Sequence, residues 1–148
     1  MSNKEIHVID GTGLVAGRLA SVIAKRLLNG EKIVVVNAEK IIIVGKPKSI
    51  LERFKKRIVE WKTYYNPEKR GPKYPRRPDL IFKRMVRGML PYKKPKGREA
   101  YRRLRVYIGI PDEFKNHKFE NVPQAIRKNI KVPYISLGEV YKHFVGKL

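Results

Sequence analysis

The stretch EIHVIDGTGLVAGRLASVIAKRLLNGEKIVVVN, residues 5–37, decides the fold of this chain. It opens with an apolar segment at 5–10 and continues into the glycine-containing turn 11–13. Apolar residues then recur at helical spacing up to Asn29-Gly30, a pair typical of a helix end. The β-branched run 32–37 reads as a strand covered on both faces. The stretch therefore predicts strand, turn, helix and strand, the pattern of an α/β domain.

A second apolar run at 40–44 follows, separated from the first only by Ala38 and Glu39. A link this short is too small for a crossover between parallel strands. We therefore expect either a local antiparallel pairing of the two runs or one kinked strand, and the residues do not decide between them.

The next segment predicts a long helix from Pro47 to Trp61. Pro47 and the pair Ser49 and Glu52 are typical of a helix start. Apolar residues at helical spacing, of which Phe54 is one, then line a single face, and cations occupy the others.

Further elements are expected downstream. A helix opening at Arg77-Pro78 is followed by a short helix at 98–104 and a strand at 105–109. Residues 111–148 read as a proline-containing extension whose last helix packs on the main domain, residues 1–110. The start of that last helix is marked by the capping pair Ser136 and Glu139, and its apolar face extends to Leu148.

The composition combines a foldable core with a very high positive charge. Among 148 residues there are 35 Lys and Arg against 13 Asp and Glu, a net charge of +22, while 42% of residues are hydrophobic. Such a charge destabilises a compact protein by self-repulsion, so a polyanionic partner is the simplest explanation for it. The absence of cysteine excludes disulfides and thiolate chemistry and fits a reducing cytoplasm.

The charge is concentrated in residues 46–105. This segment holds 22 basic and 5 acidic residues, a net +17, and the other 88 residues carry only +5. Aromatic side chains are interleaved with these cations. Lys and Arg neutralise phosphates and unpaired bases stack on aromatic rings, so this composition favours RNA. DNA is not excluded, but no recognition-helix motif is evident.

Few residues suggest catalysis. The turn 11–17 resembles a phosphate-binding glycine loop, but its third glycine stands one position late, and Asn37 occupies the place of the acidic ribose ligand. We expect a structural turn there, with an RNA phosphate or a small nucleotide at the helix start as alternatives. The histidines are far apart, and no carboxylate pair or triad is evident, so no metal site, cofactor or enzyme activity is predicted.

Neither a signal peptide nor a membrane span is predicted. The opening residues 1–7 lack an apolar core, and no apolar run approaches the roughly 18 residues that a membrane helix needs. We expect a cytoplasmic protein without membrane contact.

Residues 77–109 carry a specific family pattern. The order RMVRGMLP at 84–91, KGR at 96–98 and LRVYIG at 104–109 closely resembles the signature of large-subunit ribosomal protein L13. GRLAS at 17–21 and VNAEK at 36–40 are also similar to blocks of that family. Beyond Gly109 the chain departs from the bacterial form and resembles the archaeal and eukaryotic branch, with an archaeal source favoured.

The resemblance implies a three-layer α/β/α domain around a four-stranded parallel or mixed sheet, with basic loops and a C-terminal helical extension. It also implies a structural constituent of the large ribosomal subunit that binds large-subunit (23S-type) rRNA, contacts neighbouring ribosomal proteins, takes part in assembly and uses no small-molecule substrate. The alternative is a small nucleotide-dependent or RNA-modifying enzyme that uses the Gly11–Gly17 turn.

The expected rRNA contacts are basic residues, led by Arg77, Arg87 and Arg98 of the family pattern. Gly88, Leu90, Pro91 and Tyr107 are expected to hold the backbone and core instead. The full set of expected rRNA-binding cations is Arg18, Lys46, Lys48, Arg53, Lys56, Arg57, Lys69, Arg70, Lys73, Arg76, Arg77, Arg84, Arg87, Lys93, Lys94, Lys96, Arg98, Arg102 and Arg103. The expected base-stacking residues are Tyr65, Tyr74 and Tyr92.

Overall fold

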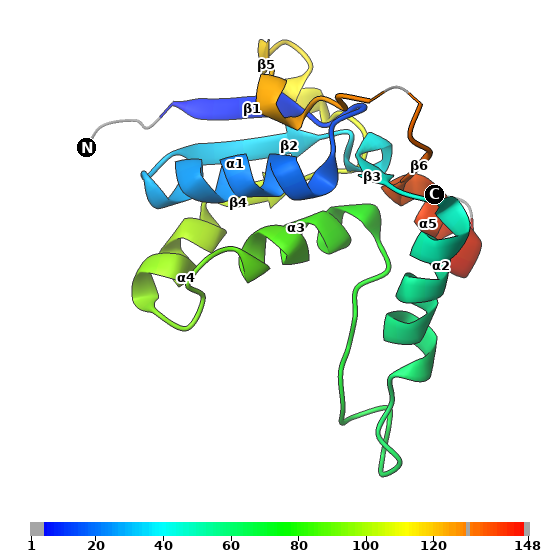
Figure 1. The fold of residues 1–148 in the computed structure, drawn as a ribbon. Helices are drawn as coiled ribbons and strands as arrows, with labels where there is room; N and C mark the ends of the chain where they lie inside the picture. The colour runs from blue at the N-terminus through cyan, green and yellow to red at the C-terminus, as the bar shows by residue number, and fades with distance from the viewer. Residues whose placement is uncertain (1–4, 130, 147–148) are drawn as a thin grey trace.

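The computed structural model describes residues 5–129 and 131–146 (Figure 1). The strands are β1 (Ile6–Asp10), β2 (Lys32–Val36), β3 (Ile42–Val44), β4 (Leu104–Val106), β5 (Phe119–Glu120) and β6 (Tyr134–Ser136). The α-helices are α1 (Ala16–Leu28), α2 (Pro47–Lys55), α3 (Pro78–Gly88), α4 (Pro95–Arg102) and α5 (Leu137–Phe144). Short 3-10 turns are η1 (Ala38–Lys40), η3 (Asp112–Phe114) and η4 (Pro123–Ala125), and a π-helical turn, η2 (Lys56–Glu60), continues α2.

The main sheet has four strands in the order β4-β2-β1-β5, and every pairing is parallel. The predicted α/β fold with a four-stranded sheet is therefore confirmed. The β1-α1-β2 unit runs through the residues expected from the sequence, because α1 gives the crossover that two parallel strands need.

The two faces of the sheet are covered differently. On the first face, alternate strand residues such as Ile9, Ile33 and Val35 pack with α1, α3 and α4 in one large core. On the second face, Val8, Val34 and Val36 pack under the segment 107–119, which contributes Phe114 from η3. The second covering layer is thus a loop with a 3-10 turn, whereas the first consists of full α-helices.

The run 40–44 follows neither of the two expected arrangements. After β2 the turn η1 redirects the chain, and β3 pairs antiparallel with β6 in a separate two-stranded sheet. Asn37 makes this turn possible because its backbone is left-handed, with φ of 57°, and its Nδ2 donates to Asp10 Oδ1 at 3.0 Å.

The expected helix starts were correct in part. Ser136 accepts a hydrogen bond from the Glu139 backbone N–H at 3.2 Å, as its capping pair predicts. The pair Ser49 and Glu52 does not cap α2, which begins two residues earlier at Pro47, with Lys46 as its N-cap residue. α4 begins at Pro95 instead of 98, since a proline suits the first helical position. Leu148 lies outside the described residues.

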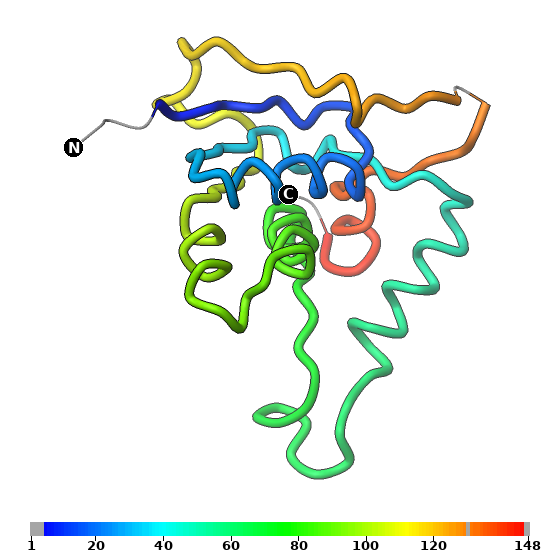
Figure 2. Tube along the Cα trace, turned by 60° about the vertical axis from the view of Figure 1, so that its left-hand side comes forward, coloured from blue at the N-terminus to red at the C-terminus, as the bar shows by residue number. Residues whose placement is uncertain are grey.

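Residues 47–77 form a projecting arm, which Figures 1 and 2 show leaving the domain through α2 and η2 and returning as an extended segment to α3. The buried side chains Ile50, Phe54 and Ile58 anchor it to the core. Among the described residues, no helix is long and apolar enough to cross a membrane.

Candidate nucleic-acid interface

Cations are distributed along the whole length of the arm. Residues 47–77 contain 11 basic and 3 acidic residues, a net +8. The apolar stripe of α2 faces the core, so its remaining positions, including Arg53 and Lys56, are exposed. Lys73 is held differently, because its Nζ donates at 2.8 Å to the carbonyls of both Pro67 and Glu68 and so closes the loop at the tip.

Aromatic rings in the arm divide into a set that packs against other side chains and an exposed set. Tyr74 packs edge-on against Phe54 with ring centroids 5.9 Å apart, and the Arg57 guanidinium lies 5.5 Å from the Tyr74 ring. Tyr74 therefore fastens the returning segment to α2. Tyr65 is 75% exposed, with Arg70 5.6 Å from its ring, and Tyr64 is fully exposed. Tyr64 and Tyr65 therefore offer exposed rings for stacking, as does Trp61 at the end of η2, which is 55% exposed.

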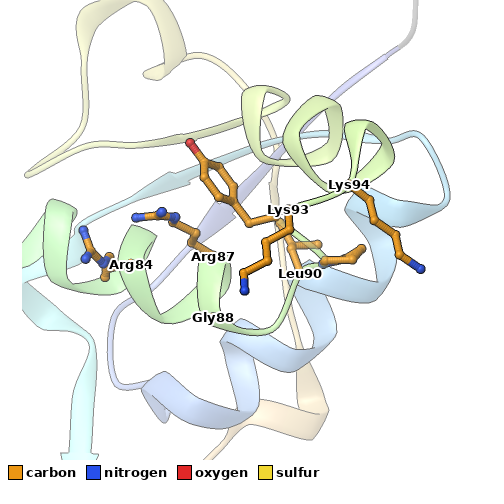
Figure 3. A pocket seen from close by; sticks show the side chains of 8 residues that line it. Arg84, Arg87, Gly88, Leu90, Lys93 and Lys94 are labelled. Carbon is orange, nitrogen blue, oxygen red and sulfur yellow. The ribbon is translucent and has the colours of Figure 1, made fainter.

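A second cationic surface lies at the end of α3, around a pocket of about 520 Å³ (Figure 3). Arg84 and Arg87 reach it from α3, and Lys93 and Lys94 reach it from the loop before α4. The lining is completed by Gly88, Leu90, Pro91 and Tyr92. The pocket therefore combines four positive charges with an apolar floor.

Tyr92 forms part of a packed group beside this pocket. The Arg87 guanidinium lies 4.0 Å from the centroid of the Tyr92 ring, and Tyr101 packs edge-on against the same ring at 5.6 Å. Burial raises the pKa of Tyr101, although the positive charges of Arg87 and Arg84 oppose the shift. Tyr92 is half-buried, so Arg87 and Tyr101 already occupy part of the ring surface expected to take a base.

The expected backbone role of Gly88 is wrong. Gly88 is exposed, has no positive φ, and a Cβ built on it would meet nothing within 4 Å. The glycine that the local structure requires is Gly97, whose Cβ would lie 2.0 Å from the Pro91 carbonyl oxygen. Leu90 is buried and Tyr107 packs against Phe114, so these two expectations are confirmed.

Most of the expected cations are exposed, with three half-buried exceptions. Two of these exceptions, Arg57 and Arg87, lie against the rings of Tyr74 and Tyr92. Arg103 is the third, and its Nη2 donates to the Leu27 carbonyl at 2.6 Å, so its guanidinium caps the end of α1. The exposed expected cations are Arg18, Lys46, Lys48, Arg53, Lys56, Lys69, Arg70, Lys73, Arg76, Arg77, Arg84, Lys93, Lys94, Lys96, Arg98 and Arg102.

The structure brings these cations together in groups. The arm carries one group, the α3 pocket a second, and α4 a third with Lys96, Arg98 and Arg102. Arg18 lies apart on α1, where it lines a smaller hollow of about 210 Å³ with Arg127 and Lys128 of the extension. Arg77 is partly neutralised by Asp79, whose Oδ2 lies 3.2 Å from its Nη2.

The glycine turn after β1 is a structural turn. The backbone N–H groups of Gly11, Gly13 and Val15 donate to the carbonyls of Val36, Lys40 and Ala125 at 3.0, 3.0 and 2.8 Å. The N–H of Thr12 donates to Asp10 Oδ1, and that of Leu14 donates to the Gly11 carbonyl. A phosphate cradle needs such donors to be free. This turn therefore has no N–H group from residue 11 to 15 left for a nucleotide.

Comparison with known proteins identifies the family. The model of the family described as ribosomal protein L13 matches residues 4–113. The chain belongs to the ribosomal protein L13 family. L13 family membership confirms the resemblance carried by residues 77–109, and it gives no support to the alternative of a nucleotide-dependent or RNA-modifying enzyme.

Relatives in the L13 family match over nearly the full length. A protein of Methanosphaera stadtmanae is 52% identical over 93% of this chain and 95% of its own length. A protein of Archaeoglobus fulgidus is 47% identical over 94% of this chain and 87% of its own length. A protein of Methanocaldococcus jannaschii is 46% identical over 95% of this chain and 98% of its own length. Each is named large ribosomal subunit protein uL13.

Proposed function

We propose that this L13 family member is a structural constituent of the large ribosomal subunit that binds and stabilises large-subunit rRNA. The observation that carries the proposal is the cationic arm, because a projection with a net charge of +8 gains stability only next to a polyanion. The role is non-catalytic, and its place in the cell is the cytoplasmic large subunit.

The arm and the α3 pocket would act on different parts of the RNA. Arm cations such as Arg53, Lys56 and Lys69 neutralise phosphates along the backbone of a strand, which fixes position without reading sequence. Tyr64 and Tyr65 at the tip offer rings to unpaired bases. At the end of α3 opposite to the arm, the α3 pocket takes a second stretch of backbone against Arg84 and Lys93.

Binding at two separated surfaces would favour folded rRNA over unfolded rRNA. A ligand that binds only the folded form of a macromolecule stabilises that form by mass action. The protein would therefore promote subunit assembly, with neighbouring ribosomal proteins as further partners.

A salt titration tests the proposal. If about eight phosphates are neutralised, the logarithm of the association constant for large-subunit rRNA should fall against log salt with a slope of roughly −6 to −7. Filter binding to rRNA fragments measures this slope, and bulk tRNA is the competitor that reports nonspecific binding. A slope near −1, or equal preference for tRNA at high salt, would contradict the proposal.

A further inference from the structure

A third cationic hollow, of about 510 Å³, lies over the second face of the main sheet, away from the arm and the α3 pocket. It is lined by Ile6 of β1, Lys32 and Val34 of β2, Arg105 of β4, and Arg103, which directly precedes β4. The remaining lining residues are Arg102, Glu113, Phe114 and His117. We call this hollow the β4 cleft.

The period of the strands explains why these side chains gather there. Val8 and Val34 belong to the second-face core, whereas Ile9 and Ile33 belong to the first. Side chains alternate between the faces of a sheet, so Ile6 and Lys32 lie on the second face as well. β4 pairs with β2 in the register Val34 to Arg105, which adds Arg105 to the same face.

The cleft has the charge and surface of a site for a nucleotide unit. Four of its lining residues are cations and one is acidic. Val34 and Phe114 provide an apolar floor, Ile6 is 44% exposed beside it, and His117 packs edge-on against Phe114 with centroids 5.4 Å apart. The volume of the cleft falls within the range of about 300–1,000 Å³ that is typical of small-ligand pockets.

We propose that the β4 cleft binds a second, separate segment of rRNA, with a base against the Val34 and Phe114 floor and its flanking phosphates on Lys32, Arg102 and Arg105. This inference rests on the proposed function. RNA is favoured over a peptide because the rim is exposed cations beside β4, whereas a peptide added to the edge of β4 would use main-chain hydrogen bonds. The domain then bridges two RNA segments across its own sheet.

The test compares nucleotide protection by three full-length double variants on large-subunit rRNA. Lys32→Gln with Arg105→Gln alters the β4 cleft, and Lys93→Gln with Lys94→Gln alters the α3 pocket. Lys25→Gln with Lys142→Gln is the control, which removes the same charge from exposed positions that line neither the β4 cleft nor the α3 pocket. Hydroxyl-radical footprinting gives the protected nucleotides, and a salt titration gives the number of phosphate contacts.

The cleft variant should lose protection of a set of nucleotides that the pocket variant still protects. Its salt slope should also become shallower by about 1.4 to 1.8, the contribution of two phosphates. The Lys25 and Lys142 variant should keep both protected sets, and Lys32→Arg with Arg105→Lys should restore the cleft footprint. Thermal unfolding of each variant shows that the fold is retained.

Other outcomes separate the two proposals. If the cleft variant keeps the wild-type footprint and slope while the pocket variant loses protection, the cleft proposal is overturned and the proposed function stands. If the cleft variant instead loses only a ribosomal protein from reconstituted particles, the cleft binds protein and the RNA proposal is overturned. If the unaltered protein protects no large-subunit rRNA, the proposed function itself fails.

Discussion

Gly97 shows how a single hydrogen atom in place of a side chain sets the geometry of the α3 pocket. The first turn of α4 lies so close to the preceding loop that a Cβ on Gly97 would sit 2.0 Å from the Pro91 oxygen and 2.9 Å from the Tyr92 nitrogen. Both neighbours are backbone atoms, which cannot rotate away. This close approach of α4 to the loop therefore fixes the position of Lys93 and Lys94, which the loop carries.

Gly97→Ala should lower the free energy of unfolding by about 1–3 kcal/mol, the usual cost of overpacking a fixed contact. Chemical denaturation measures the loss. Gly88→Ala is the matched control, because Gly88 has open space around it and lies in the last turn of α3. Equal stability of the two variants would contradict the role assigned to Gly97.

Glu120 of β5 joins three elements at the β5 edge of the main sheet. It hydrogen-bonds Nδ1 of His7 on β1 and accepts from Nη2 of Arg26 on α1 at 2.9 Å, while Arg26 Nε also contacts Glu31 at 2.5 Å. Burial on its own raises the pKa of Glu120, but the hydrogen bonds from His7 and Arg26 and the charge of Arg26 outweigh it, so the net pKa is lowered.

This lowered pKa predicts an acid-sensitive contact. A carboxylate with a folded-state pKa below its ordinary value of 4.5 stabilises the fold above that pH, and the stabilisation is lost as the pH falls through the folded-state pKa. The wild-type protein should therefore lose unfolding free energy as the pH falls below about 4.5, and Glu120→Gln should lose less. Chemical denaturation at a series of pH values measures the difference. Glu52→Gln, an exposed carboxylate on α2, should leave the profile unchanged. Identical profiles for wild type and Glu120→Gln would refute this.

At the scale of elements, the arm depends on one aromatic contact between its two limbs. Tyr74 on the returning segment packs against Phe54 of α2, and Arg57 covers the same ring. Between this contact and the tip, the residues are exposed. The position of the tip is therefore determined at Tyr74.

Tyr74→Ala should release the returning segment while the domain stays folded. An edge-on aromatic pair contributes about 0.5–1.5 kcal/mol, so trypsin should cleave between Lys69 and Arg77 about two- to tenfold faster. Tyr64→Ala removes an exposed ring at the tip and should leave the rate unchanged. Bound rRNA should slow cleavage in both variants. Equal rates for the two free variants would rule out the Tyr74 contact as the fastener.

The elements that the sequence predicted are those with a local signal. β1, α1 and β2 follow from periodicity and from the Asn29-Gly30 end, and α3 follows from Arg77-Pro78. β5 has two residues and β6 has three, which is too short for a recognisable period. The partner of each is a strand distant in sequence, so no local pattern marks it, and the destination of β3 was missed for the same reason.

The residues of the candidate site also divide into those that a local sequence pattern predicts and those that depend on distant contacts. Exposure of the cations on α2 was predictable, because the apolar stripe of the helix defines which face is turned away. The role of Arg103 was not, since its acceptor is the carbonyl of Leu27, 76 residues earlier in the chain. The β4 cleft was missed because it is assembled from β1, β2, β4 and the segment after them.

At the scale of the whole molecule, the net charge of +22 opposes folding wherever no polyanion is bound. Added salt screens this repulsion, because the Debye length falls from about 10 Å at 0.1 M to about 3 Å at 1 M. The thermal midpoint of the free protein should rise with sodium chloride, by about 2–4 °C for each kcal/mol recovered. Calorimetry at several concentrations measures it, and an unchanged or falling midpoint would contradict the expectation.

The pairing of β5 with β1 has a consequence for how the protein is made. β1 lies at the start of the chain and β5 at residues 119–120, and His7 and Glu120 are 113 positions apart. A ribosome synthesising this protein releases β1, α1 and β2 long before β5 exists. Until then the outer edge of β1 has open backbone groups, a template for unwanted pairing. The nascent chain thus stays exposed to aggregation until most of it has been translated, while its cationic arm is already available to RNA.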